Sequence, residues 1–396
     1  MASLADGTSE ILNPLTSRDT VATVRACEAL GAEVRKEERK WVVKGSSTLT
    51  TPDDVINVEN SGTTIRIMTA VSALAPGFTV LTGDASVRRR PMMPLLDALR
   101  QIGVECWSTK GDGTPPIVVK GGGVRGGRAT MRGDVSSQFI SAILIVSPMA
   151  KEDTVVLLTS ELKSKPYVDM TREVMKYFGV NVECLKNGFL IEAGQRYQPR
   201  RFNVPGDFSS AAFILAAAAV TGSNVTVSNL SMDTLQGDRK IIDVLREMGC
   251  QVKVGDGWVR VEGSGMLRGV KVDCGDTPDL LPVISVLGAV AEGETVLFNA
   301  EHARFKESDR IHAMSRELSK MGVKVKETKD GLIVEGGRLK GGIVDAHRDH
   351  RVFMALAVAG LVADGETVVV GEESVDVSYP EFIEDMVKLG ANFRRV

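Results

Sequence analysis

Cationic side chains gather at a few points of this 396-residue chain, in patterns that would suit a phosphate or a carboxylate. A guanidinium fork or an ammonium group attracts such anions. The cations cluster in three connecting segments: SVRRRPMMP around Arg88–Arg90, ELKSKPY around Lys163 and Lys165, and HARFKESDR around Arg304–Arg310. A charge run is usually a solvated surface, but the prolines and polar turn residues beside these runs favour binding loops over amphipathic helices.

Polar residues also stand where apolar, helix-like segments begin. They are Arg66, Ser136–Gln138, Ser209–Ser210 and His347–Arg351. A helix N-terminus carries unpaired N–H groups and a partial positive charge, so several of them meeting at one place would attract an anion. A serine at a helix start is explained equally well as an N-cap. Because the pattern recurs, the two interpretations are evenly balanced.

Short motifs repeat along the whole chain at one period. Aliphatic–Gly–small motifs that would end a helix recur in steps of 68 to 76 residues, at Gly31, Gly103, Gly179, Gly249, Gly322 and Gly390. Polar turns that would open a helix recur in the same phase, at Asn60, Asp134, Asp207, Asp276 and Asp349. A third series, a glycine followed by a β-rich run, follows most of these helices, as in DGETVVVG. Three series in step make coincidence improbable and predict six α/β units.

Six such units are too many for one core in a chain of this length, so we expect two domains of three units each. The fourth unit begins near Gly206, after the turn-rich segment QRYQPRRFNVP. The predicted domains are therefore residues 1–204 and 205–396. The first unit is expected to be incomplete: its exit glycine is Gly7, and the spacing in the other copies places its opening turn about nine residues before Met1.

Composition excludes several classes of protein. The net charge is 48 − 51 = −3 and aromatic residues make up only 5%, so nucleic acid is not an expected partner. The longest apolar stretches are about half of what a membrane-spanning helix needs, and no basic leader is visible, so we expect no membrane association. Five scattered cysteines favour a reduced, cytoplasmic protein without disulfides or zinc.

For two apparent motifs, the neighbouring residues do not support the function that the motif alone would indicate. The pattern G-x-G-x-x-G occurs at Gly121–Gly126, but the alternating RATMRGD that follows predicts a strand and not the helix that a dinucleotide site requires. DAHRDH, at Asp345–His350, contains metal-ligand residue types, but Arg348 and Arg351 would repel a cation. We therefore expect neither a metal nor a nucleotide cofactor.

Several motifs together resemble the signatures of the 5-enolpyruvylshikimate-3-phosphate synthase family. They are NSGTTIR at Asn60–Arg66, RRRPM, GDVSSQF at Gly133–Phe139, KSKPYVDMT at Lys163–Thr171, GDTPDLLP, FKESDRI and DHR, and they span essentially the whole chain. The resemblance implies a two-domain inside-out α/β barrel, with three βαβαββ units in each domain, closing on substrate. It also implies transfer of the enolpyruvyl group of phosphoenolpyruvate to the 5-hydroxyl of shikimate-3-phosphate, with release of phosphate.

The same resemblance implies roles for individual residues. Shikimate-3-phosphate would be held by Ser136, Ser137, Gln138, Ser164, Tyr167, Asp279 and Lys306, and phosphoenolpyruvate by Gly62, Arg90, Gln138, Lys306, Arg310 and Arg351. Asp279 would take the proton of the 5-hydroxyl, while Glu307 and Lys306 would handle the proton at the methylene carbon. His302 and His350 are further candidate contacts. The implied enzyme is a cytoplasmic monomer that needs no metal and no cofactor.

The chain departs from the family pattern in three places. The family's Gly-Ser-Lys-Ser…Asn-Arg segment is not found and is expected before Met1, so the 396 residues alone are expected to be poorly active and less stable. Val377 stands where many members have a lysine, and His302 stands where many have Asn or Glu.

Three alternatives were weighed. A transferase acting on UDP-N-acetylglucosamine would carry a cysteine before the Arg-Pro loop, and LTGDASVRRRPMM has none. The others are a truncated, non-catalytic remnant that binds shikimate-3-phosphate, and an RNA 3′-phosphate cyclase-like ligase. For the ligase, DAHRDHR is better explained by the shikimate family.

Overall fold

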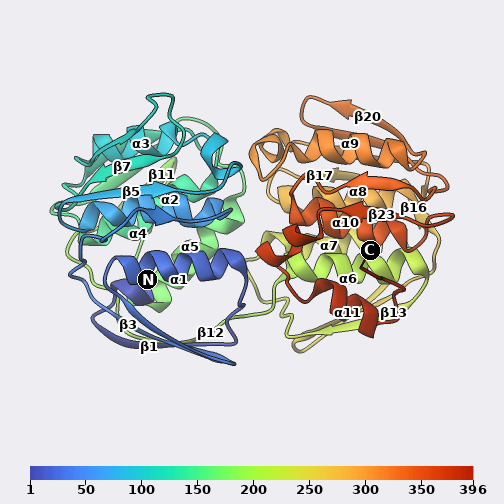
Figure 1. The fold of residues 1–396 in the computed structure, drawn as a ribbon, viewed down its shortest axis with the longest axis horizontal. Coiled ribbons are helices and arrows are strands. Elements are labelled where there is room, and N and C mark those ends of the chain that lie inside the picture. The colour runs from blue at the N-terminus through green and yellow to red at the C-terminus, as the bar shows by residue number, and fades with distance from the viewer. Residues whose placement is uncertain (396) are drawn as a thin grey trace. The chain divides into compact units, whose positions relative to one another are not determined.

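The computed structural model describes residues 1–395 and contains two compact units, Met1–Val204 and the residues from Pro205 onward. We call them unit 1 and unit 2 and describe each by itself. Each unit has its own apolar core of buried aliphatic and aromatic side chains. Both units alternate helices with short strands, as Figure 1 shows.

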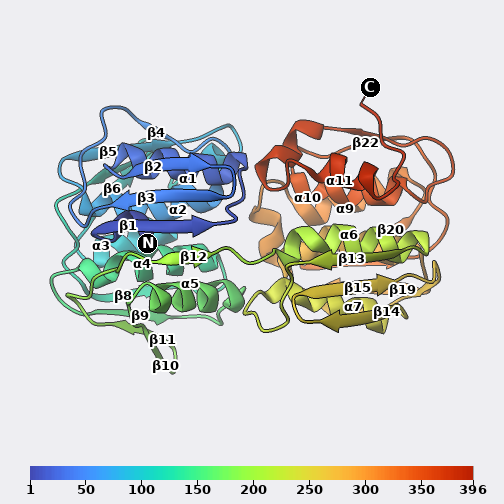
Figure 2. The ribbon, with the colours of Figure 1, turned by 90° about the horizontal axis from the view of Figure 1, so that it is seen from below.

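Unit 1 repeats one sheet arrangement three times within residues 1–204. The strand orders are β12-β1-β3-β2, β4-β5-β7-β6 and β8-β9-β11-β10. In each sheet the first pair is parallel and the other two pairs are antiparallel. The strands are β1 Gly7–Leu12, β2 Glu33–Glu37, β3 Lys40–Gly45, β4 Ile56–Asn57, β5 Phe78–Thr82, β6 Glu105–Ser108, β7 Ile117–Lys120, β8 Gly127–Met131, β9 Thr154–Leu158, β10 Glu183–Leu185, β11 Gly188–Ile191 and β12 Arg201–Asn203. The parallel pairing of β12 with β1 joins the two ends of unit 1 in one sheet, which can be followed in Figure 2.

The helices of unit 1 fall into a buried pair and an outer set. They are α1 Arg18–Ala29, α2 Gly62–Val71, α3 Met93–Gln101, α4 Ser137–Val146 and α5 Lys165–Tyr177, with short 3-10 turns η1 Ala2–Leu4, η2 Ser72–Leu74, η3 Val87–Arg89 and η4 Ser147–Met149. α2 and α4 are buried almost throughout and pack against each other, because most of their residues are apolar or small; Arg66 and Gln138 are the exceptions. α5 fully buries only Val168 and Met175, which lie two turns apart on one face.

Unit 2 has the same kind of architecture. Its described sheets are β13-β15-β14, β16-β18, β17-β19-β21-β20 and β22-β23, and the third has the strand arrangement of unit 1. The strands are β13 Asn224–Ser228, β14 Gln251–Gly255, β15 Trp258–Glu262, β16 Leu267–Arg268, β17 Lys271–Asp273, β18 Ala291–Glu292, β19 Glu294–Phe298, β20 Lys324–Thr328, β21 Gly331–Glu335, β22 Ile343–Asp345 and β23 Val368–Val370.

Helices α6, α8 and α10 of unit 2 are buried on nearly all sides, whereas α7 and α9 each keep an exposed face. The helices are α6 Phe208–Thr221, α7 Ile241–Glu247, α8 Leu281–Ala289, α9 Arg310–Lys320, α10 His350–Gly360 and α11 Phe382–Lys388. The 3-10 turns are η5 Gly237–Lys240, η6 Pro278–Leu280, η7 Glu301–Phe305 and η8 Glu372–Val377. No helix in the described part of the chain is both long and apolar enough to cross a membrane.

The predicted helix ends are confirmed. All six repeat glycines have φ between 84° and 103°, the left-handed conformation that closes a helix without a Cβ penalty. Three of the five predicted helix-opening positions precede their helices without capping them. Ser61, next to Asn60, is the N-cap of α2; Ser136, after Asp134, is the N-cap of α4; and η6 intervenes between Asp276 and α8. The strand predicted after Gly126 is β8, so no helix follows the G-x-G-x-x-G pattern there.

Candidate active site

The start of α2 in unit 1 leaves space that an arginine fills. Ser61 caps the helix by accepting a hydrogen bond of 3.2 Å from the Thr64 N–H. Next to it, a Cβ built on Gly62 would lie 1.9 Å from Nη1 of Arg90. Of the arginines at 88, 89 and 90, only Arg90 is buried, and it donates to Ser86 Oγ at 3.3 Å. Glycine at 62 therefore lets a buried guanidinium lie against the N-terminus of α2.

An amide side chain joins α2 to α4. Gln138 accepts a hydrogen bond from the guanidinium of Arg66 and donates one of 2.8 Å to Thr63 Oγ1. The Arg66 guanidinium also lies over the ring of Phe139, 5.3 Å from its centroid. Arg66 is itself buried. The contacts bring two arginines and a glutamine to the adjacent starts of two helices.

The start of α4 holds its serines in an unusual way. Ser136 is the N-cap residue, but among residues 1–395 no backbone N–H of α4 is capped by its hydroxyl. Ser137 follows as the first helical residue and is buried. Ser136 therefore does not cap α4 with its side chain in the described part of the chain, and a role for these serines as anion ligands stays a prediction.

The loop before α5 lies against the same region. Lys163 N–H donates to the carbonyl of Gly133 at 3.1 Å, and Thr171 and Ser141 hydroxyls lie 2.8 Å apart between α5 and α4. Ser164, buried at the start of α5, has φ of 54°, which is uncommon for a residue with a side chain. Tyr167 follows one turn into α5. Unit 1 thus places the predicted residues Gly62, Ser136, Ser137, Gln138, Ser164 and Tyr167 at or near the starts of α2, α4 and α5, and the side chain of Arg90, which ends η3, against the start of α2.

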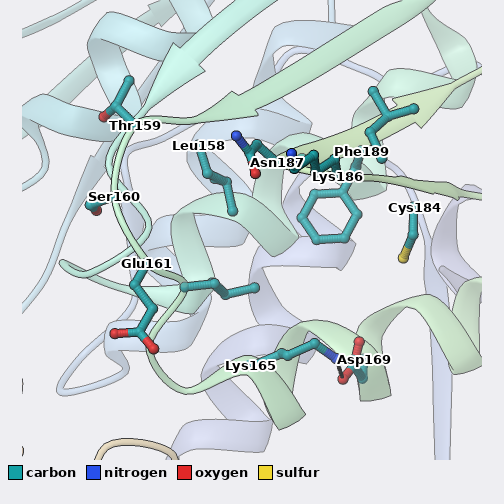
Figure 3. Close-up of a pocket in the computed structure, with 13 residues that line it drawn as sticks. Leu158, Thr159, Ser160, Glu161, Lys165, Asp169, Cys184, Lys186, Asn187 and Phe189 are labelled. Carbon is teal, nitrogen blue, oxygen red and sulfur yellow. Dashed lines mark hydrogen bonds and ion pairs between the residues drawn. The ribbon is translucent and has the colours of Figure 1, made fainter.

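A cavity of about 570 Å³ lies beside this region, as Figure 3 shows. Its walls come from the segment after β9, the start of α5 and the β10–β11 hairpin. Lys165 and Asp169 point toward each other across one edge, and the exposed Cys184 lies on another. None of the predicted site residues lines this cavity, although Lys165 and Asp169 of the KSKPYVDMT motif do.

Unit 2 contains a buried ionic network centred on Arg310, the first residue of α9. Its Nη1 lies 2.7 Å from Asp279 Oδ1, its Nη2 lies 2.7 Å from Glu307 Oε2, and its Nε lies 2.8 Å from Asp349 Oδ2. Arg310 is only 1% exposed. Burial alone would lower the pKa of this guanidinium, but the charges of the three carboxylates raise it above its ordinary value. Arg310 therefore stays charged and fixes the positions of three acidic groups.

Asp279, in η6, is bound by three cations from three elements. Besides Arg310, Lys306 Nζ lies 3.2 Å from its Oδ1 and Arg351 Nη2 lies 3.2 Å from its Oδ2. Burial alone would raise the pKa of this carboxyl, but Arg351, Lys306 and Arg310 hold it well below its usual range. Asp279 is therefore a carboxylate at neutral pH and able to accept a proton.

The start of α10 contributes the next part of the network. Asp349 is fully buried, caps the helix by accepting from the Arg351 N–H at 2.9 Å, and also accepts from Ser308 Oγ at 3.1 Å. Burial lowers the pKa of His350 to about 4, so this imidazole is neutral at pH 7. Its Nδ1 is buried and has no hydrogen-bond partner within residues 1–395. His302 is half-buried on η7, four residues before Lys306.

Two buried acidic residues were missed by the sequence analysis. The sequence places Asp349 in a helix-opening turn and in the DAHRDH and DHR motifs but gives it no role, and its contact with Arg310 spans 39 residues. Asp238, in η5, accepts a hydrogen bond from Ser209 Oγ, and burial together with the charge of Asp279 raises its pKa to about 7. An aspartate beside glycine in QGDRK has the sequence pattern of an ordinary turn, so no local signal distinguishes it.

Repeated α/β units, with arginines and serines near helix starts in unit 1 and carboxylates held against cations in unit 2, are features of an enzyme that acts on small molecules. A family model described as EPSP synthase (3-phosphoshikimate 1-carboxyvinyltransferase) matches residues 1–386. This chain belongs to the EPSP synthase family. The family expected from the sequence motifs is therefore confirmed, and the comparisons give no support to the alternatives weighed there.

Individual relatives agree with the family match. The chain is 48% identical over 395 residues to the 3-phosphoshikimate 1-carboxyvinyltransferase of Methanocaldococcus jannaschii, covering 99% of this chain and 92% of that protein. It is 51% identical over 386 residues to that of Methanocella arvoryzae, covering 97% and 91%. The solved EPSP synthase of Acinetobacter baumannii superposes with a TM-score of 0.81 at 29% identity, covering 98% of this chain and 92% of that one. The expected two-domain α/β fold class is thereby confirmed.

Proposed function

We propose that this protein transfers the enolpyruvyl group of phosphoenolpyruvate to the 5-hydroxyl of shikimate-3-phosphate, in the shikimate pathway toward chorismate and aromatic amino acids. The proposal rests on the family, and its main structural support is the carboxylate of Asp279 held by three cations. We further propose that the enzyme works as a monomer in the cytoplasm and needs neither metal nor cofactor.

Unit 1 supplies most of the recognition of shikimate-3-phosphate in this proposal. The hydroxyls of Ser136, Ser137 and Ser164 and the start of α4 hydrogen-bond the phosphate. Gln138 contacts the ring region, and the aromatic ring of Tyr167 covers its apolar face. Hydroxyl and amide donors suit this role because their fixed directions select ligands by shape, and because they are neutral and add no charge to the site.

Arginines from both units bind phosphoenolpyruvate in the same proposal. Arg90, Arg310 and Arg351 take its phosphate and carboxylate, because a planar guanidinium matches either group with two parallel hydrogen bonds. Gly62 leaves the space in which the guanidinium of Arg90 lies. Gln138 and Lys306 add hydrogen bonds, and His302 and His350 remain candidate contacts.

Asp279 is the base that takes the proton of the 5-hydroxyl. In the protein without substrate its pKa is far too low for an efficient base, because three cations attract its negative charge. When Arg351, Arg310 and Lys306 hydrogen-bond the anionic substrates, part of that attraction is transferred to the substrates and the pKa of Asp279 rises. Substrate binding thereby switches on the base.

The reaction then proceeds by addition and elimination. As Asp279 accepts the hydroxyl proton, the 5-oxygen bonds to C2 of phosphoenolpyruvate and the methylene C3 gains a proton from Lys306, with Glu307 beside it. The product of this step is a tetrahedral, non-covalent intermediate. C3 then returns a proton to the same pair, the bond between C2 and the phosphate oxygen breaks, and inorganic phosphate leaves with the proton that Asp279 had accepted. Asp279 is then again a carboxylate. Atoms and charges balance without a further reactant.

The test is Asp279→Asn, assayed by phosphate release from phosphoenolpyruvate and shikimate-3-phosphate. Turnover should fall by roughly 10²-fold or more, the usual effect of losing a positioned base, while binding of shikimate-3-phosphate is largely kept. Asp243→Asn, on the exposed side of α7, is the matched control and should leave turnover unchanged. Near-normal turnover by the Asp279 variant would remove it from this role. Phosphate release with UDP-N-acetylglucosamine in place of shikimate-3-phosphate would contradict the proposed acceptor.

A further inference from the structure

A buried carboxylate on α9, Glu317, binds the turn that leads into α10. Its Oε1 lies 2.8 Å from His347 Nε2, and its Oε2 accepts from Lys320 Nζ at 2.6 Å and from the Asp345 N–H at 3.0 Å. The side chain has no exposed surface. Burial alone would raise the pKa of Glu317, but the hydrogen bonds from these three residues lower it. A charge is therefore kept inside the protein to hold residues 345–347.

The turn needs such support because its backbone is unfavourable. His347 and Arg348 have φ of 52° and 59°, two consecutive left-handed residues that both carry side chains. Each such residue costs free energy through a clash of its Cβ, and the conformation persists only where neighbours fix it. Within the turn, the His347 N–H donates to Asp345 Oδ1 at 2.7 Å. Glu317 adds two contacts from outside the turn. It accepts a hydrogen bond from the Asp345 N–H, just before the two left-handed residues, and it contacts the ring of His347, the first of them.

The same face of α9 holds the turn at its other end. Arg310 precedes Glu317 by seven residues, so the two side chains project from one face of the helix, two turns apart. Arg310 binds Asp349, which in turn caps α10 through the Arg351 N–H. One helix face therefore clamps the chain on both sides of the strained pair. Two residues beyond the clamp stands Arg351, whose guanidinium contacts Asp279.

We propose that Glu317 is a positioning residue for Arg351: by holding the left-handed turn it fixes the start of α10 and the direction of this guanidinium. The inference rests on the proposed function, in which Arg351 binds phosphoenolpyruvate. Without the charge only one of the two side-chain oxygens remains, so it can no longer hold both the Asp345 N–H and the His347 ring, and the turn relaxes toward ordinary backbone angles. Binding of phosphoenolpyruvate then weakens, while shikimate-3-phosphate keeps its serine ligands in unit 1.

The test is Glu317→Gln, which keeps the size of the side chain and removes its charge. We expect the KM for phosphoenolpyruvate to rise about tenfold, the scale of one charge-assisted hydrogen bond. The KM for shikimate-3-phosphate and kcat should change by less than about threefold. Glu262→Gln is the matched control, because Glu262 also lies between two cations, 2.8 Å from Lys253 and 3.3 Å from Arg260. It should change neither KM.

A rescue separates positioning from simple loss of stability. Glycine adopts positive φ without penalty, so adding Arg348→Gly to Glu317→Gln should restore much of the affinity for phosphoenolpyruvate. Equal changes in both KM values, or a lowered melting temperature with no change in either, would overturn the proposal. If the glutamine variant does not fold, His347→Ala carries the same test, and an unchanged KM for phosphoenolpyruvate would overturn it.

Hydrogen–deuterium exchange gives a measurement that does not depend on activity. Peptides covering residues 343–351 should exchange faster in Glu317→Gln and unchanged in Glu262→Gln. If Glu317→Gln exchanges faster but the wild-type protein releases no phosphate, the result counts against the proposed function and leaves the clamp in place. Unchanged exchange in this segment would overturn the clamp itself.

Discussion

The two units meet the problem of binding anions in different ways. In unit 1 the candidate ligands are hydroxyls, an amide and buried arginines at helix starts. In unit 2 every candidate cation lies within 3.2 Å of a carboxylate, and Arg310 binds three of them. In unit 2 an anion must therefore compete with Asp279 and its neighbours for these cations, whereas the contacts given for the unit 1 ligands are with hydroxyl and amide groups. We infer that unit 1 serves recognition and that unit 2 couples binding to proton transfer.

The largest expected difference between the units is in stability. Arg310→Met would leave three carboxylates buried without their shared cation, so the free energy of unfolding should fall by about 3–5 kcal/mol. Denaturant titration followed by the fluorescence of Trp258, after Trp41 and Trp107 are changed to Phe, reports on unit 2. The matched variant in unit 1, Arg90→Met, should cost only about 1 kcal/mol when Trp41 and Trp107 are followed instead. Equal losses of unfolding free energy in Arg310→Met and Arg90→Met would contradict the difference between the two units.

A smaller difference should appear as the pH is lowered. The pKa of His350 falls from 6.5 to about 4 on folding, so the unfolded chain binds this proton more readily. His350 should therefore contribute a loss of up to about 3 kcal/mol between pH 6.5 and pH 4, while Asp238, whose pKa is raised by folding, contributes in the opposite direction as it gains a proton over the same range. At still lower pH, protonation of Asp279 and Asp349, whose pKa values are also lowered by folding, destabilises unit 2.

The variant His350→Asn tests this dependence of the free energy of unfolding on pH. Between pH 6.5 and pH 4 the change in its free energy of unfolding should be more favourable than in the wild type by up to about 3 kcal/mol, and the loss at still lower pH should remain. His312→Asn serves as the control, because that ring is exposed and pairs with Glu327 at the surface. If the free energy of unfolding changes with pH in the same way in the wild type and in His350→Asn, other groups determine the loss of stability in acid.

The smallest expected change concerns space in unit 1. Gly62→Ala would place a methyl group 1.9 Å from Arg90 Nη1, so the end of the arginine must move. Because only a flexible side chain shifts, folding should be retained while the KM for phosphoenolpyruvate rises about tenfold. Gly337→Ala, where a Cβ would meet nothing within 4 Å, is the control. An unchanged KM in Gly62→Ala would argue that Arg90 does not bind this substrate from its present position.

The parts of the fold that depend on local rules could be predicted from sequence. Helix-ending glycines such as Gly103 and Gly322 recur because only glycine closes a helix cheaply in the left-handed conformation. That periodicity predicted six α/β units, and the motifs predicted the family, which the comparisons confirm. Buried helices such as α6 could also be expected, because their apolar residues occupy every side.

The ionic contacts could not be predicted in the same way. Arg310 meets Asp279 and Asp349, which lie 31 and 39 residues away in sequence, and no periodicity links them. Glu317 occurs in an ordinary charged helix, SRELSKMG, and only the packing of α9 against β22 and α10 buries it. Position in the folded chain, and not residue type, distinguishes a buried carboxylate from a solvated one.

The pairing of β12 with β1 also has a consequence for synthesis on the ribosome. The sheet that contains both strands joins residues about 190 positions apart, as in the hydrogen bond of Asn13 with Asn203. At about 5–20 residues per second, β1 waits on the order of 10–40 s for its last neighbour to emerge. During that time the edge of β1 that will face β12 is an open template for other strands. We therefore expect nascent unit 1 to need protection from aggregation until translation has passed residue 203 and the exit tunnel.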